Sequence, residues 1–145
     1  MAGLKIYVGC ALTNLPVGEG ERLECLLIDL KHGLRNRSYE VLEFLGLKAG
    51  TASDVYHHDH DCVDECDIFV AICDCPSIGL GMEFERAILK EKQVLAFAHK
   101  DSRITRMVIG AGEVEERVTF ERYTTPEDIL RHIERVAPIV GGTTR

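Results

Sequence analysis

The residues IFVAICDCPSIGLGMEFERAI, at positions 68–88, decide the fold that this sequence predicts. The opening run IFVAI contains no polar residue, which is typical of a strand buried on both faces. Phe84 and Ile88 stand at helical spacing after a loop that contains Gly79 and Gly81. A buried strand, a glycine-rich turn and a helix, in this order, are the unit from which parallel α/β sheets are built.

Apolar runs and helical stripes alternate along the rest of the chain. Strands are predicted at 5–11, 41–44, 68–73, 94–98 and 118–120, and helices at 23–34, 51–65, 84–91, 104–108 and from Thr125 onward. Ser53 is a candidate N-cap for the second helix. We therefore predict an α/β fold, a flavodoxin-like or Rossmann-like open parallel sheet of five strands with helices on both faces.

The composition restricts the class of protein. The chain has 145 residues, of which 46% are hydrophobic, so we expect a single domain over 1–145 with a flexible tail at about 138–145. The net charge of −7 argues against binding to nucleic acid or to an anionic membrane, but not against a small phosphorylated ligand. Without a long apolar stretch or a leader pattern, we expect a cytoplasmic protein.

Six cysteines fit a reducing compartment, and several lie close to histidines. His57, His58, His60, Cys62 and Cys66 precede the strand 68–72, whereas Cys73 and Cys75 follow it. A strand of this length separates its ends by roughly 20 Å, so the two groups cannot share one ion. The first group alone lacks paired C-x-x-C spacing. We predict no metal site and no cofactor.

Glu83 is the first candidate functional residue. It follows Gly79 and Gly81 and is expected in the first turn of a helix, where the helix dipole would keep the carboxylate ionised. An ionised, oriented carboxylate beside a ligand-sized gap is what a covalent nucleophile requires. The loops after Ala11 and Cys73 should converge at the carboxyl ends of the strands, where ligands bind in such sheets. The alternative interpretation is an acidic residue that only stabilises its helix.

Asp59 and Tyr7 are two further candidates. On the helix 51–65, Asp59 shares a face with Val55, Cys62, Val63 and Cys66, so its carboxyl group should point partly inward. A buried carboxyl group tends to keep its proton and can act as a general acid. Tyr7 lies in the first strand, where its hydroxyl needs a partner. Both residues also have structural interpretations: a helix Asp bonded locally, and a core Tyr with a satisfied hydroxyl.

Three segments resemble the nucleoside 2-deoxyribosyltransferase superfamily. SIGLGMEFERA (77–87) is similar to its motif G-x-G-[MY]-E-L-G-x-A, which carries the catalytic glutamate. YHHDHDCVDECDIFVAI (56–72) resembles the segment with an aspartate ahead of the central strand, and Asp59 falls on that aspartate. KIYVGCA (5–11) resembles the first strand, with Tyr7 at the position of the aromatic hydroxyl that orients the nucleophile.

The resemblance implies cleavage of the bond between a base and deoxyribose by double displacement. Glu83 would attack the anomeric carbon, Asp59 would manage the proton of the leaving base, and Tyr7 would hold Glu83. The resemblance also implies contacts to a small-molecule deoxynucleoside or deoxynucleotide from Gly9, Ala11, Ser77, Gly79, Gly81 and Thr105.

Several positions depart from the family pattern. Ser77 stands where transferases often have an aspartate, which favours hydrolysis over base exchange. Ala11 and Thr13 stand where nucleotide hydrolases have a serine and an arginine that grip the 5′-phosphate, so the phosphate should help only modestly. Glu85 replaces a usual glycine. Two alternatives stay open: a deoxyribosyltransferase that exchanges bases, and a non-catalytic domain that senses nucleosides or nucleotides.

The segment ITRMV (104–108) predicts self-association. A lone short helix cannot bury this much apolar surface on its own domain, so we expect a homodimer or larger assembly. The resemblance agrees, since in that family a residue near Thr105 reaches the site of the neighbouring subunit.

Overall fold

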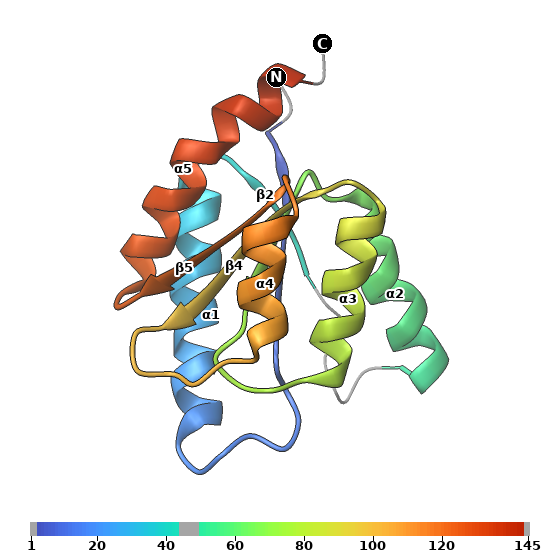
Figure 1. Cartoon of the computed structure of the whole chain (residues 1–145). Helices are drawn as coiled ribbons and strands as arrows, with labels where there is room; N and C mark the ends of the chain where they lie inside the picture. Colours follow the sequence, from blue (N-terminus) through green and yellow to red (C-terminus); the bar gives the residue numbers. More distant parts are fainter. Residues whose placement is uncertain (1–2, 44–49, 144–145) are drawn as a thin grey trace.

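The computed structural model describes residues 3–43 and 50–143. Their strands form one parallel sheet in the order β2-β1-β3-β4-β5 (Figure 1). The strands are β1 (Lys5–Cys10), β2 (Glu40–Leu42), β3 (Ile68–Ile72), β4 (Gln93–His99) and β5 (Val118–Tyr123). The predicted α/β fold with a five-stranded parallel sheet is confirmed.

Helices cover both faces of the sheet. They are α1 (Glu19–Asn36), α2 (Ala52–Glu65), α3 (Ile78–Leu89), α4 (Arg106–Val114) and α5 (Pro126–Thr143). Helices α1 and α5 lie on one face, and α2, α3 and α4 lie on the other (Figure 1). This arrangement explains why the central strands lack a polar face.

Strand β1 divides its side chains between two cores. Ile6 and Val8 pack toward α1 and α5, whereas Tyr7 packs with residues of α2 and α3. All three side chains are fully buried. Because successive side chains of a strand point to opposite faces of the sheet, the Tyr7 side chain lies on the face that carries Glu83 and Asp59.

The direction of chain progression reverses at β1. The chain passes from β1 through α1 to the edge strand β2, and then returns across β1 through α2 to β3. The loops 11–18 and 73–77 therefore leave adjacent strands at the same edge of the sheet. This is the switch point at which open α/β sheets bind ligands.

Several element ends differ from the prediction. The strand β2 ends at Leu42, and Phe44 lies outside the described residues. The N-cap of α2 is Thr51, not Ser53, because Thr51 and Asp54 form a reciprocal capping box. The helix at ITRMV begins only at Arg106, after its N-cap Thr105, and continues to Val114.

Helix α5 includes residues 138–143 of the segment that was expected to be a flexible tail, and residues 144–145 lie outside the described residues. The flexibility of this segment stays a prediction. Val136 and Val140 pack against the core on the α1 side, and this contact extends the helix beyond Ala137.

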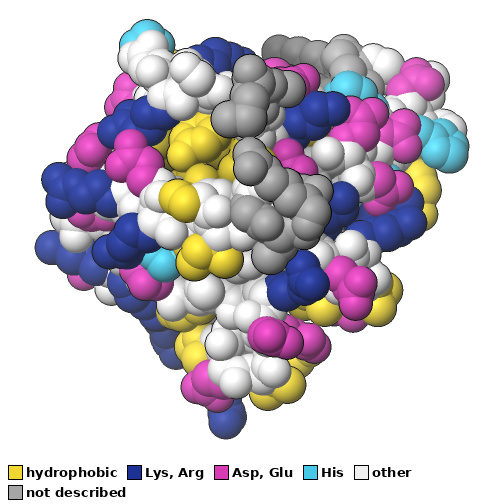
Figure 2. Space-filling view, turned by 90° about the horizontal axis from the view of Figure 1, so that it is seen from above, with side chains coloured by type: hydrophobic (Ala, Val, Ile, Leu, Met, Phe, Trp, Pro, Cys, Tyr) yellow, Lys and Arg dark blue, Asp and Glu magenta, His cyan; other side chains and the backbone are white. Residues whose placement is uncertain are grey.

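Charges of both signs are interspersed on the face shown in Figure 2, where Lys and Arg side chains lie among Asp and Glu side chains. Within the described ranges, no helix combines the length and the apolar character that crossing a membrane requires.

Candidate active site

Glu83, Tyr7 and Asp59 come together on the α2–α3 face of the sheet. Tyr7 lies in β1, Asp59 in α2 and Glu83 in α3. The Tyr7 hydroxyl donates a hydrogen bond to the Glu83 carboxyl group, and the charge of Asp59 acts on both groups. The ring of Tyr7 stacks on Phe69, with 5.8 Å between the ring centroids, so its hydroxyl is held in place. The fold thus brings together the three residues that the sequence singled out for catalysis.

Glu83 is half-buried, and its carboxyl group is incompletely bonded. Its Oε2 atom is buried and has no hydrogen-bond partner within the described part of the chain. The pKa of Glu83 is raised from 4.5 to about 7, and burial is the main cause. The hydrogen bond from Tyr7 lowers this pKa, and the charge of Asp59 raises it. Burial and the nearby Glu83 also raise the pKa of Tyr7 well above its usual range. An unpartnered carboxylate oxygen in a shielded site is suited to nucleophilic attack.

The predicted placement of Glu83 is wrong in one respect. Ser77 is the N-cap of α3, so Gly79 and Gly81 belong to the first helical turn and neither has a positive φ. Glu83 lies one turn further along, where the helix dipole has little effect. Burial therefore dominates its titration, and the carboxyl group is not kept ionised by the helix terminus.

Asp59 is half-buried on α2. Of the inner face predicted for this helix, Cys62, Val63 and Cys66 are buried, whereas Val55 and Asp59 are only partly covered. The Cys62 thiol is close enough to Asp59 and Glu83 for both charges to raise its pKa, which burial raises most, to about 11. Sequence reasoning assigned no role to Cys62, although its spacing from Asp59 places both residues on one face.

Gly9 and Ala11 lie in packed surroundings. A Cβ at Gly9 would stand 2.9 Å from Leu80 Cδ1 and 3.0 Å from Phe69 Cε2, so a larger residue here would force these side chains of α3 and β3 to shift. Ala11 is 1% exposed and belongs to the core beneath α1 and α5. A substrate contact by either residue stays a prediction.

The other predicted binding residues border a different space. A cavity of about 510 Å³ lies between α3 and α4 and is lined by Ser77, Gly81 and Thr105, but not by Glu83, Tyr7 or Asp59. Gly79 is exposed at the start of α3. The structure thus separates the predicted site into a carboxylate cluster on one side of α3 and a cavity on the other.

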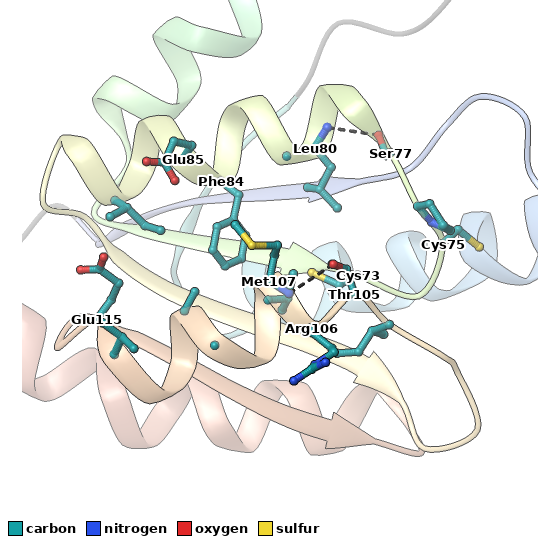
Figure 3. A pocket seen from close by; sticks show the side chains of 18 of the residues that line it. Cys73, Cys75, Ser77, Leu80, Phe84, Glu85, Thr105, Arg106, Met107 and Glu115 are labelled. Atoms are coloured by element: carbon teal, nitrogen blue, oxygen red, sulfur yellow. Dashed lines mark hydrogen bonds between the residues drawn. The ribbon is translucent and has the colours of Figure 1, made fainter.

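The α3–α4 cavity is mostly apolar, with Leu80, Phe84 and Met107 among its lining residues. Figure 3 shows Glu85 and Glu115 at one end of it, and Cys75 and Ser77 at the other. Glu85 therefore borders this cavity, whereas Glu83 does not. The hydroxyls of Ser77 and Thr105 cap α3 and α4 by accepting hydrogen bonds from Leu80 N and Met107 N.

A buried ionic network that sequence reasoning missed holds the loop after β3. The Asp74 carboxylate accepts hydrogen bonds from Arg22 Nη2 at 2.7 Å, Tyr123 Oη at 2.5 Å and the backbone N–H of His99 at 3.0 Å. Arg22 also binds Glu19. No spacing rule pairs positions this far apart in the chain, so the sequence carried no indication of this cluster.

The cysteines and histidines of the described residues form no group of three or more side chains that would hold a metal ion. All six cysteines are free. His58 and Cys62 instead contact the backbone carbonyl of Glu43.

Comparison with known proteins shows similarity in sequence and in fold. No family model matches the chain. A protein of Thermofilum pendens, provisionally named 2′-deoxynucleoside 5′-phosphate N-hydrolase 1, is 25% identical over 116 residues, which cover 75% of this chain and 81% of that protein. The chain spans most of the length of this relative.

Two solved structures share the fold. The CMP N-glycosidase of Clostridium botulinum superposes with a TM-score of 0.68 at 18% identity, over 90% of this chain and 98% of that chain. A 2-deoxyribosyltransferase of Bacillus psychrosaccharolyticus superposes with a TM-score of 0.61 at 18% identity, over 86% of this chain and 89% of that chain.

Proposed function

We propose that this chain, whose sequence and fold support its place in the nucleoside 2-deoxyribosyltransferase superfamily, cleaves the N-glycosidic bond of 2′-deoxynucleosides or their 5′-monophosphates. Its relatives are N-glycosidases and deoxyribosyltransferases, which are enzymes of this kind. The observation that carries the proposal is the Glu83 carboxyl group, which accepts a hydrogen bond from Tyr7, lies near Asp59 and has a buried oxygen without a partner among the described residues.

The reaction proceeds in two displacements. In the first, a Glu83 oxygen forms a bond to the anomeric carbon while the bond from that carbon to the base breaks. The electron pair leaves with the base, and Asp59 supplies the proton that neutralises it. In the second, water attacks the anomeric carbon, Asp59 takes the proton of that water, and the Glu83 carboxylate leaves. Two carboxyl groups of different protonation state serve retaining glycosidases in the same way.

Hydrolysis is favoured over base transfer, and a 5′-phosphate helps only modestly. Ser77 supplies a neutral hydroxyl where a carboxylate would retain an acceptor base. The arginine nearest to the first strand in sequence, Arg22, is already paired with Glu19 and Asp74. One neutral hydrogen bond contributes roughly 0.5–1.5 kcal/mol, which corresponds to about tenfold in affinity or less.

A non-catalytic sensing domain is the alternative from another class. Glu85 was one motive for it, but Glu85 lines the α3–α4 cavity, which Glu83 does not line. A base-exchanging transferase is the alternative within the superfamily.

The decisive experiment incubates the protein with deoxynucleosides and their monophosphates, with and without a competing base, and measures released base and new nucleoside. Glu83→Ala should reduce turnover by about 10⁴-fold or more without unfolding the domain, and Asp59→Asn should reduce it by about 10²-fold or more with little change in melting temperature. Efficient formation of a new nucleoside would support the transferase instead. Binding without any release of base would support the sensing domain.

A second copy of the chain is proposed to cover α3 and α4. Large apolar side chains are exposed on both helices, namely Ile78, Met82 and Leu89 on α3 and Met107 and Val114 on α4. Helix α4 contains no buried residue, although most of its residues are apolar or glycine. A twofold interface would bury these faces against each other.

A further inference from the structure

Glu43, the residue that follows β2, is held from two directions. Its carboxylate accepts hydrogen bonds from Lys31 at 2.7 Å and from Arg35 of helix α1. Its backbone carbonyl contacts His58 Nε2 at 2.7 Å and accepts a hydrogen bond from Cys62 Sγ at 3.6 Å, both from helix α2. Because a carbonyl oxygen can only accept, His58 must carry its proton on Nε2 and donate it.

The hydrogen bond from His58 to the Glu43 carbonyl connects the surroundings of two candidate active-site residues, Tyr7 and Asp59. Leu42 is the register partner of Tyr7 in the β1–β2 ladder, so Glu43 follows the residue that lies beside Tyr7. His58 directly precedes Asp59. The hydrogen bond therefore joins the sheet edge beside Tyr7 to the helical turn that carries Asp59.

Within the described residues, the amino-terminal half of α2 is held by the Thr51–Asp54 capping box and by the contact of the Tyr56 ring with His60, but it buries few side chains. Its buried residues are His60, Cys62 and Val63, all beyond Asp59. The ion pair of Asp64 with Arg86, at 2.7 Å, and the hydrogen bond from Lys92 to the Asp64 carbonyl also lie beyond it. Residues 52–59 are exposed or half-buried. The bond from His58 to Glu43 is therefore a tertiary contact of the helical turn that carries Asp59.

We propose that the hydrogen bond from His58 to the Glu43 carbonyl positions Asp59 against Tyr7 and Glu83. His58 is thus a positioning residue, which acts through Asp59 without touching the substrate. This inference rests on the proposed function in that Asp59 is the acid–base group. It adds a residue for which neither the sequence motifs nor the comparisons assign a role.

Three variants test the contact directly. His58→Ala removes the donor and should lower kcat by about 10- to 100-fold with KM changed less than about twofold, the size of effect that a misplaced catalytic group produces. His58→Gln can present a side-chain N–H at nearly the same place and should restore most of the rate. His57→Ala, on the neighbouring exposed histidine, is the matched control and should behave like the unmodified protein. A His58→Ala protein with unchanged kcat would overturn the proposal.

A double-mutant cycle separates positioning from a general structural role. In an Asp59→Asn background, His58→Ala should reduce kcat by less than about twofold, because there is no acid left to position. The same factor in both backgrounds would show that His58 only supports the fold, and the proposal would be wrong.

A titration of the Glu83 carboxyl carbon by NMR keeps the inference separate from the proposed function. The charge of Asp59 raises the pKa of Glu83, so His58→Ala should lower this pKa in the same direction as Asp59→Asn does. An unchanged Glu83 titration in His58→Ala would overturn the positioning role even if the protein cleaved no nucleoside. Absence of cleavage by the unmodified protein, or full cleavage by Glu83→Ala, would instead overturn the proposed function.

Discussion

At the scale of single residues, the burial of Glu83 sets the pH dependence of the proposed reaction. The nucleophile must be ionised, and its pKa is about 7, so the acidic limb of the kcat/KM profile should rise with pH and reach half of its maximum near pH 7. Tyr7→Phe removes a hydrogen bond that lowers this pKa, so the rise should move to higher pH. Initial rates between pH 4 and 9 test both expectations. A rate that is flat above pH 5 would contradict the burial argument.

Glu83→Gln should stabilise the protein at neutral pH. The pKa of Glu83 lies above its unfolded value of 4.5, so the unfolded chain ionises first, and stability falls as pH rises from 4.5 to about 7. At 1.36 kcal/mol per pH unit, this loss amounts to at most about 3 kcal/mol. The side-chain amide of the Glu83→Gln variant does not ionise, so this variant does not lose stability in this pH range.

The measurement is the free energy of unfolding of both proteins by urea at pH 4.5 and at pH 7.5. The advantage of the glutamine variant should grow between these two conditions. An advantage that does not change with pH would show that the Glu83 carboxylate is not destabilising.

At the scale of elements, Gly9 determines how closely α3 packs on β1. The added methyl group of Gly9→Ala would overlap with the side chains of Leu80 and Phe69. Their nearest atoms would be 2.9 Å and 3.0 Å away, which is shorter than an ordinary van der Waals contact. We expect a loss of about 1–3 kcal/mol in the free energy of unfolding, together with a lower kcat, because Leu80 precedes Glu83 on the same helix. Gly20→Ala is the control, since its nearest neighbour is Leu15 Cδ1 at 3.7 Å. Equal stability of both variants would contradict the close approach.

At the scale of the whole molecule, the apolar surface of α3 and α4 predicts a dimer. Met107 is 81% exposed in the single chain, and Met107→Glu should shift sedimentation at micromolar concentration from dimer toward monomer. Ile28→Glu, on the opposite face of the sheet, should leave the assembly unchanged, since Ile28 is 60% exposed on α1. A monomer in the unmodified protein would refute the prediction.

The local sequence was sufficient for the order of elements and for the three catalytic candidates. The uninterrupted apolar run at Ile68 is typical of a strand buried on both faces, and the spacing after Ser77 follows the helical period of 3.6 residues. Short segments display both patterns without any knowledge of their partners. Helix ends were less predictable. Thr51 and Ser53 are both suitable caps, and only the reciprocal bond with Asp54 decides between them.

Tertiary structure alone decided the surroundings of these residues. The sequence marks Glu83 as a carboxylate near a helix start, but its raised pKa comes from burial and from side chains of β1 and α2. The contact between His58 and Glu43 likewise joins elements whose distance is set by packing. Local sequence determines which conformation a segment prefers, whereas the desolvation and charge of a site depend on which segments the fold brings together.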